Sequence, residues 1–160
     1  MRTLVLLRHA KSAWPPDDTP DARRPLAGRG RRDAPAVGRW LSEHVPTIDL
    51  VLCSPAARAM QTWDLAAAQL DPTPQLRHDE RLYDAAADDL LAVIRELPST
   101  ASTVVLVGHN PSLEGVLQLL TGAAELLKTS AIAVMTTPAA WGRAPIRSWT
   151  LQTLATPRGG

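Results

Sequence analysis

Residues 4–9 read Leu-Val-Leu-Leu-Arg-His, and this stretch is the clearest structural signal in the chain. Four consecutive apolar residues suit a strand that is buried on both faces, as strands of parallel sheets are. Similar runs occur at residues 50–52 and 104–107, and each is followed by turn residues and then by a helical pattern. Strands that alternate with helices predict an α/β domain, a three-layer α/β/α sandwich with a mainly parallel central sheet.

The segments between these runs have the periodicity of helices. Residues 31–43, 56–70, 88–97 and 112–120 are the predicted helices, because their apolar side chains recur on one face. We expect the second helix to open with Ser54 as N-cap and Pro55 at the first helical position. The fourth should stop at Gly122. Residues 131–135 and 148–154 are further candidate strands, and residues 14–22 are predicted to form a loop.

Length and composition limit the classes of protein to consider. The chain has 160 residues, which suits a single domain over residues 1–155, with residues 156–160 as a flexible C-terminal tail. A net charge of +1 favours neither nucleic acid nor an anionic membrane as partner. The N-terminal apolar run is too short for a signal peptide, and the single cysteine, Cys53, allows no intrachain disulfide. We therefore expect a cytoplasmic protein.

Candidate functional residues follow the ends of the predicted strands. In open α/β sheets, ligands bind beyond the carboxyl ends of the strands. Arg8 and His9 follow the first run, Arg58 lies in the first helical turn after the second, and His109 follows the third. The fold would therefore bring two histidines and two arginines together although they are far apart in sequence. His44 and His78 lack this placement and are expected at the surface.

Arg58 is unusual for its position. A helix N-terminus carries a partial positive charge of about +0.5, so a cation in the first turn costs roughly 0.3–1 kcal/mol. A bound anion would remove this conflict, because the free N–H groups and the guanidinium would both donate to it. A solvated arginine, or one paired with a nearby Asp, is the simpler alternative. Beside Arg8, His9 and His109, we favour a phosphate site.

Other phosphate, nucleotide and metal motifs do not fit. A cysteine phosphatase needs five residues between its Cys and Arg, but only four separate Cys53 from Arg58. The Gly-Arg-Gly at residues 28–30 does not follow a strand, as a dinucleotide fingerprint would require. The chain has no phosphate-binding loop and no zinc motif, and Asp17, Asp18 and Asp21 are expected to be solvated. We therefore expect neither a cofactor nor a metal.

Several ordered motifs carry a family resemblance. Leu7-Arg8-His9-Ala10 resembles the Arg-His-Gly signature of the histidine phosphatase (phosphoglycerate mutase-like) superfamily, with alanine in place of glycine. The closer similarity is to its short branch, the SixA-type phosphohistidine phosphatases. The motifs that follow that branch in order are Arg24-Pro25-Leu26 with Gly30, Cys53-Ser54-Pro55, Arg58, Gln61-Thr62, Gly108-His109-Asn110-Pro111 and Thr129-Ser130-Ala131.

This resemblance implies a phosphoglycerate mutase-like fold and specific roles. His9 would be the nucleophile that becomes phosphorylated, with its second ring nitrogen donating to a backbone carbonyl. Arg8, Arg58 and His109 would hold the phosphoryl oxygens without a metal. The superfamily often adds a carboxylic acid, for which Asp84 and, nearby, Glu80 are the candidates. The long insert of larger members is missing, which implies an open, shallow pocket.

The leaving group separates three possible functions. Imidazole leaves with a conjugate-acid pKa near ~6.5, so a phosphohistidine borne by a protein tolerates a weak acid or none. This phosphohistidine phosphatase is the favoured function. The second is a phosphatase of small phosphomonoesters such as nucleotides or sugar phosphates, which would need Asp84 as a competent acid. The third is a non-catalytic phosphate-binding domain, which would need Arg8 and Arg58 but not His9.

Overall fold

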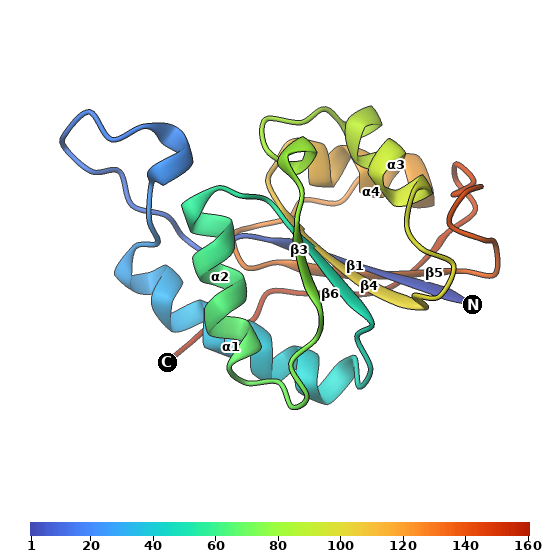
Figure 1. The fold of residues 1–160 in the computed structure, drawn as a ribbon, viewed down its shortest axis with the longest axis horizontal. Helices are drawn as coiled ribbons and strands as arrows, with labels where there is room; N and C mark the ends of the chain where they lie inside the picture. Colours follow the sequence, from blue (N-terminus) through green and yellow to red (C-terminus); the bar gives the residue numbers. More distant parts are fainter.

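The computed structural model describes residues 1–160 and contains one six-stranded sheet with helices on both faces (Figure 1). The strand order is β3-β2-β4-β1-β5-β6. Neighbours from β3 to β1 are parallel, whereas β5 runs antiparallel to β1 and β6. The predicted three-layer sandwich with a mainly parallel sheet is therefore confirmed. The strands are β1 (Arg2–Arg8), β2 (Leu50–Cys53), β3 (Leu76–His78), β4 (Thr103–Gly108), β5 (Ile132–Thr137) and β6 (Thr150–Ala155).

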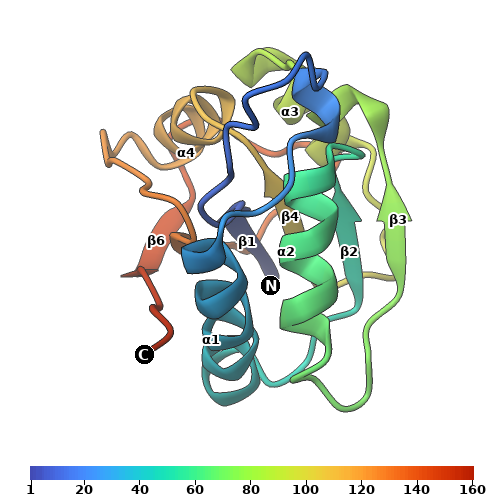
Figure 2. The ribbon, with the colours of Figure 1, turned by 90° about the vertical axis from the view of Figure 1, so that its left-hand side faces the viewer.

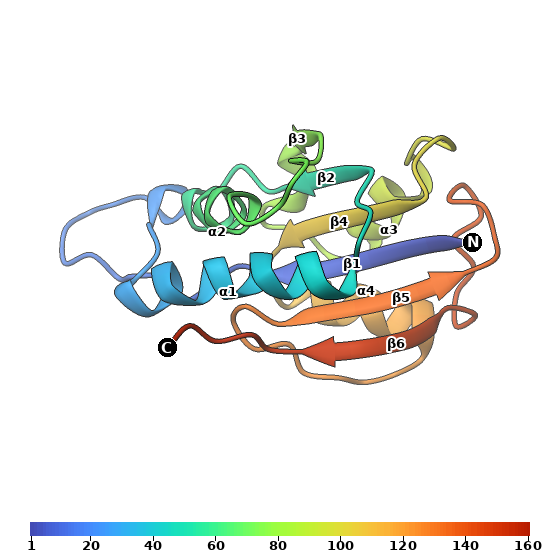
Figure 3. The ribbon, with the colours of Figure 1, turned by 90° about the horizontal axis from the view of Figure 1, so that it is seen from below.

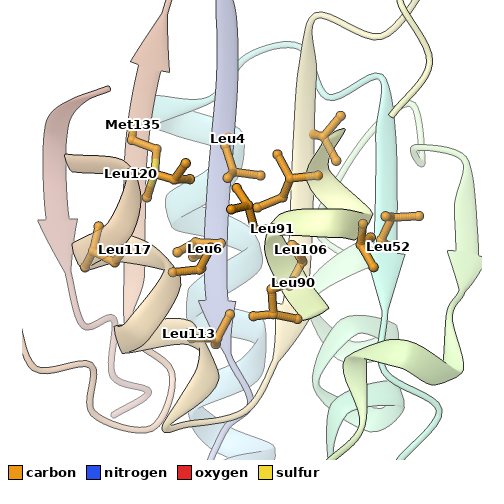
Figure 4. Packing of buried hydrophobic residues seen from close by; sticks show 14 of the residues in the cluster. Leu4, Leu6, Leu52, Leu90, Leu91, Leu106, Leu113, Leu117, Leu120 and Met135 are labelled. Carbon is orange, nitrogen blue, oxygen red and sulfur yellow. The ribbon is translucent and has the colours of Figure 1, made fainter. Parts of the chain in front are cut away.

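The helices divide evenly between the two faces of the sheet. α1 (Gly28–His44) and α2 (Ala57–Ala67) cover one face, and α3 (Ala87–Arg95) and α4 (Ser112–Thr121) cover the other (Figure 3). Val5 of β1 packs in the α1/α2 layer, whereas Leu4 and Leu6 pack against α3 and α4 (Figure 4). Alternate residues of β1 thus face two different cores, which explains why its run is apolar without interruption. None of the helices is both long and apolar enough to cross a bilayer.

Strand register brings the predicted functional residues to one edge of the sheet. Arg8 of β1 pairs with Gly108 of β4, so His9 and His109 leave neighbouring strands at the same level. The His9 N–H donates to the Gly108 carbonyl at 3.2 Å. Cys53 pairs with Val107 in the same way and places Ser54 beside the end of β4. Figure 2 looks onto this end of the molecule.

Some local predictions differ from the structure. α2 begins at Ala57 with Ala56 as N-cap, so the prediction that Ser54 caps this helix is wrong. The strand β3 was not predicted, because it is a three-residue edge strand with little burial. The predicted loop at residues 14–22 ends in a short 3-10 helix, η1 (Asp21–Arg23). The predicted stop of α4 at Gly122 is confirmed, where φ is +78°.

The C-terminal tail contacts the α1/α2 side of the molecule. Arg158 donates to the Asp33 carboxylate at 3.1 Å and to the Thr129 carbonyl at 2.8 Å. The Gly159 N–H donates to the same carboxylate at 2.9 Å. Asp33 is only 1% exposed, so the tail supplies most of the partners of a buried charge. The tail that the sequence predicts to be flexible is therefore hydrogen-bonded in the structure.

Candidate active site

A pocket of about 220 Å³ lies at the carboxyl ends of β1 and β4. It includes all four residues that the strand-end argument brought together, and no carboxylate lines it. Its cationic side chains come from three places: the end of β1, the following loop and the first turn of α2. The lining residues are Arg8, His9, Lys11, Ser12, Trp14, Arg24, Arg58, His109, Asn110 and Thr129. The charge of this lining favours an anionic ligand.

The His9 ring is held in one tautomer. Its Nδ1 is 2.7 Å from the carbonyl oxygen of Ala10, so Nδ1 carries the proton and donates it there. This is the backbone hydrogen bond expected from the sequence. Burial lowers the pKa of His9 to about 3, and the nearby His109 and Arg58 act in the same direction. At neutral pH, His9 is uncharged and its Nε2 carries the free lone pair.

Gly30 allows α1 to approach the backbone beside this histidine. A Cβ at position 30 would lie 2.1 Å from the carbonyl oxygen of Lys11, a distance no side chain could occupy. The Lys11 carbonyl accepts the Ala27 N–H at 2.9 Å, which ties the entry of α1 to the segment after β1. The backbone at Lys11, two residues after His9, is therefore held by close packing with Gly30 and by the hydrogen bond from Ala27.

His109 is a second neutral imidazole. Its ring centroid is 5.1 Å from that of His9, and its Nε2 is 2.8 Å from Ser54 Oγ. Burial lowers the pKa of His109 to about 4, with Arg58 contributing. Its Nδ1 is buried with no hydrogen-bond partner. Ser54 thus orients this histidine, a role that replaces the helix cap predicted for it.

Arg8 contributes a partly desolvated cation. Its Nη1 donates to the Leu127 carbonyl at 2.9 Å, but its Nε is buried without a partner. Burial lowers the pKa of Arg8, and the carboxylate of Glu114 opposes that shift. An unpartnered N–H donor on a cation is a suitable group to receive a phosphoryl oxygen.

Arg58 is paired with Asp21, so the alternative of an arginine held by a nearby Asp is present in the structure together with the cationic pocket, and the expectation that Asp21 is solvated is wrong. Arg58 donates to the Asp21 backbone carbonyl at 2.8 Å and to its carboxylate at 3.1 Å. The same carboxylate accepts the Tyr83 hydroxyl at 2.6 Å and pairs with Arg24 at 3.3 Å. The Tyr83 hydrogen bond and Arg58 lower the pKa of Asp21. No motif marks Asp21, since it reaches the site only because η1 folds back over α2.

The two carboxylates considered as acids lie elsewhere. Asp84 and Glu80 are both exposed, and neither lines the pocket. Asp84 adopts φ +52°, whereas the ring of the adjacent Tyr83 makes a T-shaped contact with the ring of His109, with centroids 5.8 Å apart. Tyr83 therefore lies beside His109 where Asp84 was expected from the resemblance.

The remaining reactive groups are structural or peripheral. Cys53 is buried, and burial raises the pKa of its thiol to about 12, so it is a small core residue. His44 and His78 are exposed, as predicted. Nowhere do three or more His, Cys, Asp or Glu side chains converge as a metal site would require.

The chain is similar to known proteins in sequence and in fold. The family model of the histidine phosphatase superfamily (branch 1) matches residues 4–90, which include three of the four pocket residues named from the sequence. An uncharacterized protein of Mycobacterium tuberculosis is 39% identical over 146 residues, covering 84% of this chain and 89% of its own.

Two solved structures are similar over nearly the whole chain. One, assigned as the phosphohistidine phosphatase SixA of Nakamurella multipartitia, has a TM-score of 0.86 and 33% identity, covering 98% of this chain and 96% of its own. The other, assigned as SixA of Agrobacterium tumefaciens, has a TM-score of 0.84 and 26% identity, covering 98% of both chains. The fold similarity thus extends well beyond the residues of the family match.

Proposed function

The chain belongs to the histidine phosphatase superfamily, and we propose that it hydrolyses phosphohistidine on a protein through a phosphorylated His9. The observation that carries this proposal is the state of His9: a neutral imidazole with Nδ1 bonded to the Ala10 carbonyl, in a pocket rich in cations. A nucleophile in the correct tautomer needs no general base to remove a proton before it attacks.

The first step transfers the phosphoryl group to His9. Nε2 of His9 attacks phosphorus in line, the Nε2–P bond forms, and the P–N bond of the substrate breaks. The electron pair of that bond stays on the substrate histidine, which leaves as a neutral imidazole with a proton on its other ring nitrogen. Charge in this transition state lies on the non-bridging oxygens, so fixed cations contribute most of the stabilisation. Arg8 and Arg58 supply two guanidinium groups, and His109 lies beside His9 as a further polar contact.

The second step returns the enzyme to its starting state. A water molecule attacks the phosphorus of phospho-His9, and the P–Nε2 bond breaks with its electron pair returning to Nε2. Inorganic phosphate leaves with both protons of the water, one of which it can then release to solvent. The hydrogen bond from Nδ1 to Ala10 holds the imidazole in place during both steps.

The choice of phosphohistidine as substrate rests on the leaving group. No carboxylate lines the pocket, and Asp84 and Glu80 are exposed outside it. An alkoxide leaving group needs a proton from an acid, whereas an imidazole with a conjugate-acid pKa of about 6.5 can leave with far less assistance. A site without an evident acid therefore favours a P–N substrate.

A phosphatase of small phosphomonoesters is the alternative. The observation in its favour is Tyr83, whose hydroxyl donates to Asp21 beside Arg58. Asp21 also pairs with Arg24, so this hydrogen-bonded tyrosine and carboxylate adjoin two of the pocket cations. Asp21 is already engaged by three partners, which makes it a better anchor than an acid.

The test is phosphate release from a phosphohistidine peptide in EDTA, with wild type beside His9→Ala and Asp84→Asn. We expect the wild type to be active in the chelator, His9→Ala to be inactive, and Asp84→Asn to retain activity. When the substrate carries a labelled phosphoryl group, the peptide that contains His9 should keep the label in alkaline digests of the wild type. Acid-quenched digests should lose it, because phosphohistidine is labile to acid.

The same assay includes a sugar phosphate and p-nitrophenyl phosphate as comparison substrates. Faster turnover of the sugar phosphate than of the peptide, with a sharp loss in Asp84→Asn, would replace the proposal by the phosphomonoesterase. Phosphate binding without turnover of any substrate would leave only a binding domain.

A further inference from the structure

Two exposed apolar side chains belong to loops at the pocket end of the molecule. Trp14 is 75% exposed and lines the pocket. Leu126 is 82% exposed and precedes Leu127, whose carbonyl accepts hydrogen bonds from Arg8 and Asn110 of the pocket. Figure 2 shows the two loops, blue and orange, at this end of the sheet. An isolated exposed hydrophobic residue needs no explanation, but two beside one site form a pattern.

Trp14 is exposed although its position is fixed. The Arg24 guanidinium carbon lies 3.4 Å from the centroid of the indole, and Arg24 itself is buried. Arg24 in turn donates to the Ala13 carbonyl at 3.1 Å and to the Ser12 hydroxyl. Part of the indole is therefore clamped on a buried cation while most of its surface stays open to solvent.

Leu126 is presented by an equally fixed backbone. The next residue, Leu127, is 1% exposed, and its N–H donates to the Glu114 carboxylate at 2.7 Å. Its carbonyl accepts from Arg8 at 2.9 Å and from Asn110 at 2.8 Å. Because both backbone groups of Leu127 are engaged, the exposure of Leu126 does not come from a frayed loop.

The size of the pocket separates small from large ligands. A molecule that fills its roughly 220 Å³ touches Trp14 but not Leu126, which is outside the lining. A segment of protein chain that places a phosphohistidine in the pocket extends beyond it on both sides. Such a ligand can contact exposed side chains outside the lining, as Leu126 is, as well as Trp14, and a clamped tryptophan is the type of residue that anchors interfaces.

We propose that Trp14 and Leu126 form an apolar rim that docks a protein segment in which apolar residues flank the phosphohistidine. This inference rests on the proposed function and deepens it, because it specifies the chemistry of the partner around the reacting side chain. The cationic pocket binds the phosphoryl group, and the rim selects what lies beside it.

The test uses two phosphohistidine peptides of nine residues that differ only at the positions flanking the histidine. One carries Leu and Val there, and the other carries Ser at the same positions. We expect the wild type to favour the apolar peptide by about tenfold or more in kcat/KM. In Leu126→Ala and in Trp14→Ala this preference should fall several-fold, mainly through KM.

Ile146→Ala is the matched control. Ile146 is 53% exposed and lies in the loop that follows β5. Strand β5 ends at Thr137, which pairs with Arg2 at the start of β1, so this loop leaves the sheet at the end opposite the pocket. Its variant should keep the wild-type preference. Equal wild-type rates on both peptides, or a preference that survives both rim substitutions, would overturn the rim while leaving the phosphatase intact. No release from either peptide would instead refute the proposed function, and the rim with it.

Discussion

Two hollows on opposite ends of the sheet differ in size and in chemistry. The larger, about 470 Å³, lies between the loops that precede β2 and β3 and is lined mainly by proline, threonine and apolar residues. It contains Asp49 and Asp71 and no basic side chain. The smaller, about 220 Å³, contains four cations and two histidines. The volume of a cavity is therefore a poor guide to function, whereas its position relative to the strands is a good one.

The direction of the chain accounts for this difference. Parallel strands deliver successive loops and helix N-termini to the same edge, and free N–H groups there favour anions. At the opposite edge, the Asp49 carboxylate is used by the backbone, since it accepts the N–H groups of Ser102 and Thr103 at 2.9 Å each. The larger hollow thus has a structural carboxylate, whereas the smaller has an unpartnered guanidinium N–H on Arg8 and an unpartnered ring nitrogen on His109.

The largest effect should come from removing a cation of the smaller hollow. Arg58→Ala removes one guanidinium that would face the transferring phosphoryl oxygens, and we expect kcat to fall by about 10²–10³-fold. Arg58→Lys should recover only part of the loss, because an ammonium cannot make the planar two-point contact. Phosphate release from the phosphohistidine peptide provides the measurement.

The matched change in the larger hollow is Thr73→Ala. It should leave kcat and KM at their wild-type values. A comparable loss in both variants would mean that the two hollows are not chemically distinct, and the assignment of the site would fail.

A smaller effect should follow from loosening Arg58 without removing it. Asp21→Ala deletes the carboxylate that accepts from Arg58 and Tyr83, and we expect kcat/KM to fall roughly tenfold, because the guanidinium keeps its charge but loses its orientation. Tyr83→Phe should cost less, since Arg58 keeps its partner. A loss in Tyr83→Phe as large as in Asp21→Ala would point to proton transfer by Tyr83 in place of positioning.

Deleting the C-terminal tail tests whether the stability of the fold depends on a segment outside the sheet. Deleting residues 158–160 leaves the buried Asp33 with Arg29 at 3.5 Å as its remaining ion-pair partner. We expect the free energy of unfolding in urea to fall by about 1–3 kcal/mol. In an Asp33→Asn background the same deletion should cost clearly less. An unchanged urea midpoint would instead agree with the flexible tail that the sequence predicts.

The smallest change is expected in the protonation of His9, which should not titrate between pH 7.5 and pH 5. A histidine with an ordinary pKa of about 6.5 is about 97% protonated at pH 5. Because the pKa of His9 is lowered to about 3, it should remain neutral from pH 7.5 to pH 5. The ¹⁵N shifts of its ring, assigned by comparison with His9→Asn, should stay constant over this range. A midpoint between pH 6 and 7 would show that burial does not keep this nucleophile neutral.

The strand-end residues were predictable from sequence because a strong local signal carries them. The apolar run of β1 marks where the strand ends, and His9 is simply the second residue after the last buried one. The order of the strands was not needed, since any parallel arrangement brings such residues to one edge. The same argument predicted His109 and, through the first turn of α2, Arg58.

The residues that orient this site could not be found in the same way. Asp21 and Tyr83 meet across 62 positions of sequence, and neither follows an apolar run that would mark a strand end. Ser54 had the sequence features of a helix cap but is close enough to His109 to bind it. Long-range contacts of this kind depend on how the loops fold back, and local propensity carries no information about that.

The two unpartnered nitrogen atoms of the pocket have a consequence for how this protein can evolve. Arg8 Nε and His109 Nδ1 are desolvated without a partner, and such groups destabilise a fold in proportion to their burial. Selection for thermal stability alone should therefore favour apolar substitutions at these two positions, and the resulting variants would be more stable but inactive. A laboratory campaign for a thermostable variant would need an activity screen from its first round, because this site is where durability and turnover conflict.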